Sequence, residues 1–134
     1  MDLALARIDD DPGAGRHRVL VDALRPRGMR RDDAPIDEWR RAVAPSAELR
    51  KWYRHDPQRF AEFAEFAERY RRELGSGERA AAVAALLDRA REQPLTVVTA
   101  TREVEISHAA VLLEVLRSGD ELRRPAAGLT RLEP

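Results

Sequence analysis

The stretch Arg18-Val19-Leu20-Val21-Asp22-Ala23-Leu24-Arg25-Pro26-Arg27-Gly28 begins as an apolar run and ends in a basic turn. Residues 18–24 predict a buried strand, because branched apolar side chains suit a pleated surface inside a protein. Pro26 and Gly28 then indicate a turn. Asp22 interrupts the apolar run, and Arg25 and Arg27 stand where the strand would end. This arrangement predicts a functional site at the end of the strand.

A second apolar run, Leu95-Thr96-Val97-Val98-Thr99-Ala100, predicts another buried strand. The chain between the two runs carries helical patterns and is long enough for a crossover, so we predict parallel neighbours, or strands separated by at most one strand. Residues 2–8 predict a further strand. The loop after it is too short for a helical crossover, so residues 2–8 and 18–24 should not form a βαβ pair.

Proline, serine and apolar spacing predict the helices. They are expected from Pro35 to the residue before Pro45, after Ser46 as an N-cap, from Pro57 to Leu74, over about 78–91, and over 108–117 after Ser107 as an N-cap. The expected fold is therefore α/β, a small mixed or parallel sheet of about three or four strands flanked by about five helices. We expect a single domain over residues 1–118 and a C-terminal tail over residues 119–134.

The third expected helix carries three phenylalanines at a spacing of three residues, Phe60, Phe63 and Phe66. A repeat of three drifts around a helix that turns every 3.6 residues. At least one of the three side chains should therefore be markedly more exposed than the others.

The composition excludes several classes of protein. The 134 residues contain no cysteine, which excludes disulfides and thiolate catalysis, and 43% of them are hydrophobic, which excludes a wholly disordered chain. The 24 basic and 24 acidic side chains balance, which disfavours a general nucleic-acid binder. No apolar run approaches the ~20 residues that span a bilayer. The first residues lack the features of a signal peptide, so we expect a cytoplasmic protein with no membrane partner.

Metal and cofactor motifs are missing from the sequence. The three histidines, His17, His55 and His108, stand far apart and form no ligand pair of the usual spacing. No Gly-x-x-x-x-Gly-Lys phosphate loop and no dinucleotide fingerprint occurs. We therefore expect no metal and no cofactor.

The order of the motifs resembles the YeaO-like family, bacterial proteins with a domain of unknown function. The matching segments are Arg18 to Gly28, Trp39 with Ala44-Pro45-Ser46, Leu49 to Tyr53 followed by His55-Asp56-Pro57, Phe66 with Tyr70 and Leu74, and Leu95 to Ala100 followed by His108-Ala109. The resemblance implies a compact α/β fold and no established activity. It also implies arginine, tryptophan, an aromatic residue and asparagine at four positions where this chain has Ala23, Arg25, Thr99 and Ser107.

Two loops follow the predicted parallel strands, at residues 25–31 and 101–107, and ligands of open α/β sheets bind at such strand ends. The candidate catalytic residues are His108 and Asp22, and the candidate ligand-binding residues are Arg25, Arg27, Gly28, Arg102 and Ser107. His108 falls in the first turn of a helix, whose positive end favours a neutral imidazole. A buried Asp22 is expected to contact an arginine directly.

Three functions are compatible with this pattern. The first is a module that binds a small anionic, phosphate-bearing ligand through Arg25, Arg27 and Arg102. The second is a small hydrolase or transferase in which His108 acts as base, oriented by Asp22 or Glu103. The third is a nucleic-acid or protein interaction module that uses the loop from Arg25 to Arg31 as a basic patch. Structural roles are also open, with Asp22 tying down the turn after its strand and His108 bonding the backbone.

Overall fold

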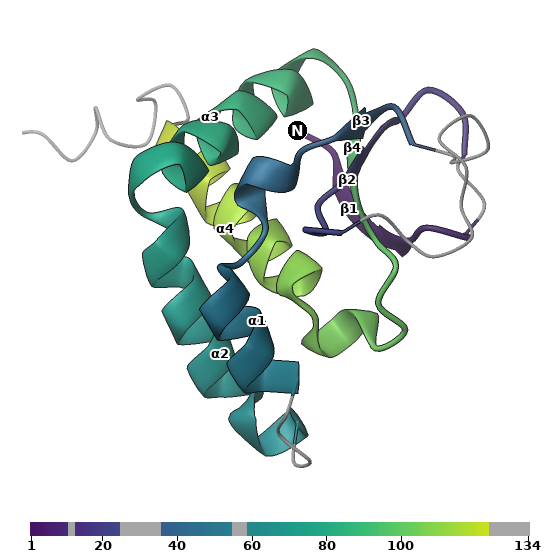
Figure 1. Ribbon diagram of the computed structural model, residues 1–134. Coiled ribbons are helices and arrows are strands. Elements are labelled where there is room, and N and C mark those ends of the chain that lie inside the picture. The colour runs from purple at the N-terminus through teal and green to yellow at the C-terminus, as the bar shows by residue number, and fades with distance from the viewer. Residues whose placement is uncertain (11–12, 25–35, 55–58, 124–134) are drawn as a thin grey trace, which may run out of the picture.

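A parallel β-sheet forms the centre of the molecule. The computed structural model describes residues 1–10, 13–24, 36–54 and 59–123. In this part of the chain the strands are β1 (Leu3–Arg7), β2 (His17–Leu20), β3 (Glu38–Trp39) and β4 (Leu95–Thr99), in the order β1-β4-β2-β3 (Figure 1). All three strand pairs are parallel. The predicted α/β fold and the predicted parallel pairing of strands 18–24 and 95–100 are confirmed.

β4 is the central strand, and its β-branched sequence explains this position. All five of its residues are buried, as expected for a strand with neighbours on both edges. Residues 2–8 do form a strand, and β4 lies between it and β2, so these two strands do not pair with each other. The register aligns Leu20 of β2 with Val98 of β4. The carboxyl ends of β2 and β4 therefore lie side by side.

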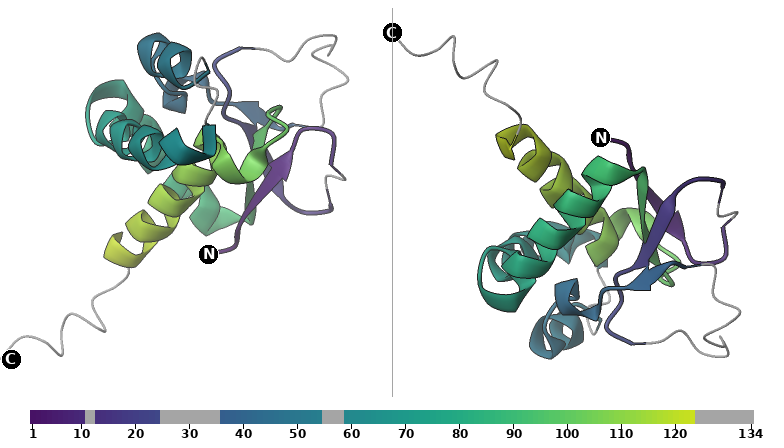
Figure 2. Two further views of the ribbon diagram at one scale, coloured as in Figure 1. Left: turned by 90° about the horizontal axis from the view of Figure 1, so that it is seen from below. Right: turned by 90° about the horizontal axis from the view of Figure 1, so that it is seen from above.

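The helices cover one face of the sheet. They are α1 (Ala47–Arg54), α2 (Arg59–Leu74), α3 (Gly77–Glu92) and α4 (His108–Arg123), and they lie together on one side in all three views (Figures 1 and 2). Val19 and Val97 belong to the large core that the strands share with these helices, whereas Leu20 and Val98 belong to a small cluster with Ile8. Successive residues thus face opposite sides of the sheet, as the two-residue period of a strand requires.

The helix boundaries follow the predicted caps. The Ser46 hydroxyl accepts a hydrogen bond from the Leu49 N–H at 3.1 Å, and the Ser107 hydroxyl accepts one from the Ala110 N–H at 3.3 Å. The Ser107 hydroxyl also donates to the Val104 carbonyl at 2.7 Å, which joins α4 to the short 3-10 helix η3 (Val104–Ile106). Both serines therefore act as the N-caps that the sequence predicted.

α2 runs without a break to Leu74, as predicted. Phe66 is 2% exposed and stacks on Tyr53, whereas Phe63 is only half-buried. The prediction that the three phenylalanines are not buried equally is confirmed by this pair; the side chain of Phe60 lies outside the described residues.

The helix expected between Pro35 and Pro45 is not formed, and this prediction was wrong. Glu38 and Trp39 form the edge strand β3, followed by the 3-10 helix η2 (Arg41–Val43). The physical reason is the outer edge of β2, whose carbonyls need donors. The Asp37 N–H donates to the Arg18 carbonyl at 2.8 Å, and the Arg40 N–H to the Leu20 carbonyl at 2.9 Å. Four α-helices, not five, therefore occur in the described part.

The last helix is longer than predicted. α4 continues to Arg123, so residues 119–123 are helical and not part of an irregular tail. At Gly119 an added Cβ would meet Leu87 Cδ1 at 2.9 Å, which shows how closely α4 approaches α3 there. The rest of the expected tail, residues 124–134, lies outside the described residues. None of the helices that the structure describes has the length and apolar character needed to cross a membrane.

Candidate ligand-binding site

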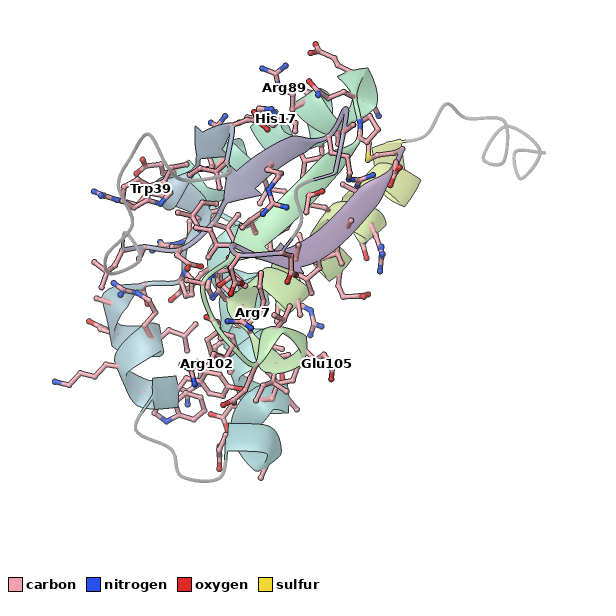
Figure 3. All side chains as sticks on the ribbon, turned by 90° about the vertical axis from the view of Figure 1, so that its right-hand side faces the viewer. Arg7, His17, Trp39, Arg89, Arg102 and Glu105 are labelled. Atoms are coloured by element: carbon pink, nitrogen blue, oxygen red, sulfur yellow. The ribbon has the colours of Figure 1, made fainter. Side chains whose placement is uncertain are left out.

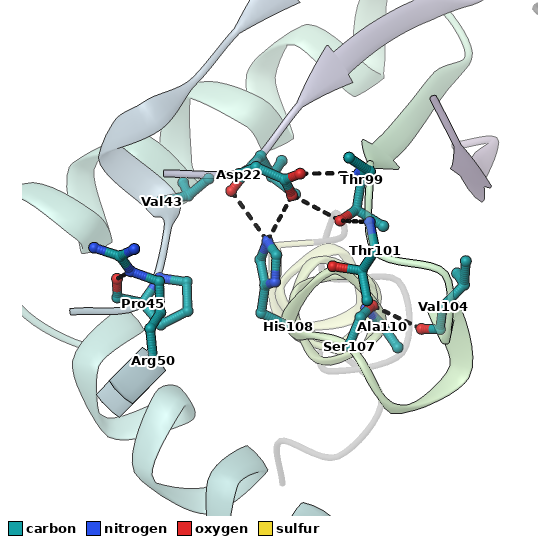
Figure 4. A network of polar contacts seen from close by, with 12 residues as sticks. Asp22, Val43, Pro45, Arg50, Thr99, Thr101, Val104, Ser107, His108 and Ala110 are labelled. Carbon is teal, nitrogen blue, oxygen red and sulfur yellow. Dashed lines mark hydrogen bonds and ion pairs between the residues drawn. The ribbon is translucent and has the colours of Figure 1, made fainter. Parts of the chain in front are cut away.

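Asp22 follows Val21 just beyond the end of β2. Its side chain makes hydrogen bonds to the end of β4, as the backbone of a strand residue would. The last ladder bond of β2 runs from the Val21 N–H to the Val98 carbonyl, at 3.0 Å. One position further on, the Asp22 carboxylate accepts the Ala100 N–H at 2.9 Å and the Thr99 hydroxyl at 2.7 Å. The carboxylate thereby ties the end of β2 to the end of β4 (Figure 4).

His108, the first residue of α4, faces the same carboxylate. Its Nε2 lies 3.1 Å from Asp22 Oδ1 and 3.2 Å from the Val21 carbonyl oxygen. A backbone carbonyl can only accept hydrogen bonds, so we assign the proton to Nε2. Both side chains are 14% exposed. The pair is therefore largely buried, with Nε2 turned inward and Nδ1 on the part of the ring away from Asp22 (Figure 4).

Opposing effects set the charge of Asp22. Burial raises the pKa of the carboxyl group, but hydrogen bonds from His108, Thr99 and the Ala100 N–H, together with the positive charge of His108, outweigh it and leave the pKa below its ordinary value. Asp22 is therefore an ionised carboxylate near neutral pH. Within the described residues no arginine forms an ion pair with it, and its partners there are His108, Thr99 and a backbone N–H. Arg25 and Arg27 lie outside the described residues, so the predicted arginine contact stays a prediction.

A pocket of about 240 Å³ opens beside this pair. It lies where the carboxyl ends of β2 and β4 meet α1, α2 and the start of α4. Its lining combines charged and polar side chains with apolar walls: Asp22, Ala23, Leu24, Pro45, Arg50, Tyr53, Phe66, Thr101, Glu103, Ile106, Ser107 and His108. The position of the pocket at the strand ends is the one that the α/β topology predicts.

The walls of the pocket are held in place by the aromatic residues of the helices. Tyr53 of α1 donates its hydroxyl to the Ile106 carbonyl at 2.9 Å, and its ring stacks on Phe66 of α2 with centroids 4.3 Å apart. Tyr70, which is fully buried, presents its ring edge-on to His108 at 6.2 Å. These contacts fix α1, α2 and η3 around the imidazole.

Arg50 of α1 is the basic side chain of this pocket. Its Nε donates to the Pro45 carbonyl at 3.2 Å, which anchors the half-buried guanidinium beside the opening (Figure 4). Among the residues that the structure describes, no ion pair involves Arg50. The guanidinium therefore has one fixed hydrogen bond and no carboxylate partner in this part of the chain.

The structure brings together some of the predicted site residues and separates others. Asp22, Ser107 and His108 line one pocket. Arg102 is exposed and lines a different hollow with Glu103, Val104, Glu105 and Ile106, on the segment between β4 and α4 (Figure 3). Arg102, a candidate ligand-binding residue, therefore does not line the pocket with Asp22 and His108.

Three further predicted residues, Arg25, Arg27 and Gly28, lie outside the described residues, so their contribution stays a prediction.

Sequence reasoning missed two residues of the site. Arg50 is one of many arginines in the chain, and only its place next to Leu49 on the first turns of a helix capped by Ser46 marks it. The sequence predicts Thr99 as a buried strand residue, and its exposure is indeed 0%, but its hydroxyl also donates a hydrogen bond to Asp22. The register of β2 and β4, which aligns Leu20 with Val98, places Thr99 beside Val21 when it is continued by one residue, and so within reach of the Asp22 side chain.

Three of the four positions where the resemblance implied other residues lie in or beside this pocket. Ala23 and Ser107 line it, and the Thr99 hydroxyl donates a hydrogen bond to the Asp22 carboxylate beside it. The fourth, Arg25, lies outside the described residues. No group of three or more histidine, aspartate or glutamate side chains in the described part is arranged to hold a metal ion.

Comparisons with known proteins place the chain in a family without an assigned activity. It is 49% identical, over 108 residues, to the uncharacterized proteins Rv3073c of Mycobacterium tuberculosis and Mb3100c of Mycobacterium bovis; the match covers 81% of this chain and 86% of each relative. It is 38% identical over 102 residues to the uncharacterized protein YeaO of Escherichia coli, covering 76% of this chain and 84% of YeaO. No solved structure matches it significantly. The profile of DUF488-N3i, described as the inactive DUF488-N3 subclade, matches residues 2–130, so the chain belongs to this family, and the predicted YeaO-like relationship is confirmed.

Proposed function

We propose that this protein binds a small anionic ligand in the pocket beyond the carboxyl ends of β2 and β4. The observation that carries the proposal is Arg50, a half-buried guanidinium that lines the pocket and has no ion-pair partner among the described residues. A guanidinium presents several N–H donors in a plane that matches phosphate, sulfate or carboxylate oxygens. An anion would give this charge the partner that the described protein residues do not supply.

The ligand is small, because the pocket has a volume of about 240 Å³. Pro45, Phe66 and Ile106 supply apolar surface, which suits the carbon skeleton of a metabolite. The charged end of the ligand would lie at Arg50. The Asp22 carboxylate does not oppose this strongly, since Thr99, Ala100 and His108 already donate to it.

A binding role fits the site better than a hydrolase or transferase role. The inward Nε2 of His108 faces two acceptors and holds its proton there. The Ser107 hydroxyl donates to the Val104 carbonyl and caps α4, so it is not poised as a nucleophile. The description of the family as an inactive subclade agrees with a pocket that binds without turnover.

The interaction-module hypothesis depends on the loop from Arg25 to Arg31, which lies outside the described residues, so no contact argues for it. A cytoplasmic location also stays a prediction from the sequence.

A phosphate titration followed by NMR tests the proposal. Backbone amides of residues 22–24, 50 and 107–109 should shift together and saturate, because they surround the pocket. The amide of Arg89 serves as the internal control, since this exposed arginine of α3 does not line the pocket. Uniform small shifts at exposed arginines, with no saturation at residues 107–109, would refute the proposal.

A further inference from the structure

The imidazole of His108 has two sides with different surroundings. Nε2 faces Asp22 and the Val21 carbonyl, and it must donate to both, whatever the charge of the ring. Nδ1 makes no hydrogen bond within the described residues. His108 itself lines the pocket. Any change in the protonation of the ring therefore takes place at Nδ1, on a side chain that lines the pocket.

The charged groups around His108 come from four elements. Asp22, beyond β2, favours the imidazolium through its negative charge, and Glu103, which precedes η3 and lines the pocket, acts in the same direction. Arg50 of α1 and the positive end of α4 oppose the imidazolium. Tyr70 of α2 stays neutral, because burial raises the pKa of its phenol. Two carboxylates therefore favour the imidazolium, and a guanidinium and a helix end oppose it.

An anion changes this balance, because it cancels the two opposing contributions at once. Placed at Arg50, it neutralises the guanidinium, and it also faces the positive end of α4. At the same time it offers an oxygen acceptor to Nδ1, which gains a hydrogen bond only if it carries a proton. Anion binding and protonation of Nδ1 therefore stabilise each other, and by linkage each must raise the affinity for the other.

We propose that His108 is a second ligand-binding residue, that it holds the anion through a protonated Nδ1, and that binding takes up one proton from solvent. The inference rests on the proposed anion site and adds the residue and the proton. The proton adds to the Nδ1 lone pair. Nε2 keeps its own proton, which stays directed at Asp22, and no covalent bond of the ligand changes. The ligand class is then a fully ionised oxyanion that accepts hydrogen bonds from both Arg50 and His108.

The test uses sulfate, because its charge stays constant over the pH range in which histidine titrates. NMR of the imidazole of His108 gives its titration midpoint without sulfate and at saturating sulfate. We expect the midpoint to rise on binding. We also expect the sulfate dissociation constant to increase by roughly tenfold per pH unit between the midpoint of the free protein and that of the sulfate-bound protein, and to level off above the latter. In a His108→Gln variant, checked for folding by circular dichroism, the affinity should be weaker and should lose this pH dependence.

The outcomes separate the inference from the proposal beneath it. If sulfate binds through Arg50 but the midpoint of His108 does not move, the proton-coupled role is wrong and the anion site stands. If sulfate produces no saturable shift at residues 107–109 at any pH, the anion site itself is wrong, and the inference falls with it. The NMR titration of the His108 imidazole in the wild-type protein tests the proposal even if the His108→Gln variant fails to fold.

Discussion

The Thr99 hydroxyl donates to the Asp22 carboxylate at 2.7 Å, although the two residues stand 77 positions apart in the sequence. They meet because β2 and β4 are parallel neighbours whose carboxyl ends are in register. The same carboxylate also accepts the Ala100 N–H and faces His108. Asp22 thus links both central strands to the start of α4, and the pocket forms around this link.

Replacement of Asp22 by alanine should destabilise the fold. The change leaves the buried Thr99 hydroxyl and the Ala100 N–H without their acceptor, and we expect a loss of about 2–3 kcal/mol in the free energy of unfolding. Denaturant unfolding measures this loss. The Asp22→Asn variant keeps an acceptor oxygen and should lose less stability. Equal stability of the wild type and Asp22→Ala would show that the hydrogen bonds of Asp22 do not stabilise the fold.

Acid should remove the contribution of Asp22. The folded-state pKa of this carboxyl lies below its ordinary value, so the unfolded state binds more protons in acid. The contribution is therefore complete above about pH 4, the range in which an unfolded aspartate ionises, and it is lost as the pH falls through the lower folded-state pKa.

The difference in unfolding free energy between the wild type and Asp22→Asn, measured from pH 7 to pH 2, should shrink in that acid range. A difference that is constant over the whole range would contradict the assignment.

Tyr70 supplies a second stabilising bond that is separate from ligand binding. Its hydroxyl, fully buried, donates to the Val43 carbonyl, which joins α2 to η2. Tyr70→Phe should lower the free energy of unfolding by about 1–2 kcal/mol, because the buried carbonyl loses its donor. Thermal unfolding checks this value. Anion affinity should change little, since the hydroxyl does not line the pocket.

Two truncations locate the end of the folded domain. A chain that stops after Ser118 loses the last turn of α4 and the close contact of Gly119 with Leu87, so it should lose about 1 kcal/mol of stability. A chain that stops after Arg123 keeps both features and should unfold at the wild-type temperature. If the two truncated chains melt at the same temperature, the last turn of α4 contributes nothing.

The sequence predicted the sheet better than its surroundings, and the residues show why. Every residue of β4, and Val19 and Leu20 of β2, is buried and β-branched or apolar, so local chemistry and tertiary environment agree at these positions. The helical spacing of Ile36, Trp39 and Val43 predicts a helix that contains Trp39. In the structure the unpaired edge of β2 draws Glu38 and Trp39 into a strand, and the Trp39 indole donates to the Asp22 carbonyl at 2.7 Å. Such a requirement of a distant strand leaves no local signal.

The candidate site was half predicted for a similar reason. Asp22 and His108 stand out locally, one as a charge within an apolar run and the other after a helix cap. The choice between arginines depends on which helix faces the strand ends. Arg102, on the segment after β4, lines a separate hollow, whereas Arg50 lines the pocket from α1. Only the packing of α1 against α2 and η3 decides this.

The sulfate affinity of three proteins tests the central claim most directly: the wild type, Arg50→Gln and the matched control Arg102→Gln. A charged hydrogen bond contributes about 1.5–3 kcal/mol, so Arg50→Gln should weaken sulfate binding by roughly ten- to a hundredfold when titrated by calorimetry at constant pH. Arg102→Gln removes the same charge outside the pocket and should leave the affinity within about twofold of the wild type. Equal weakening by both substitutions, or none by Arg50→Gln, would contradict the account of this pocket as an anion site.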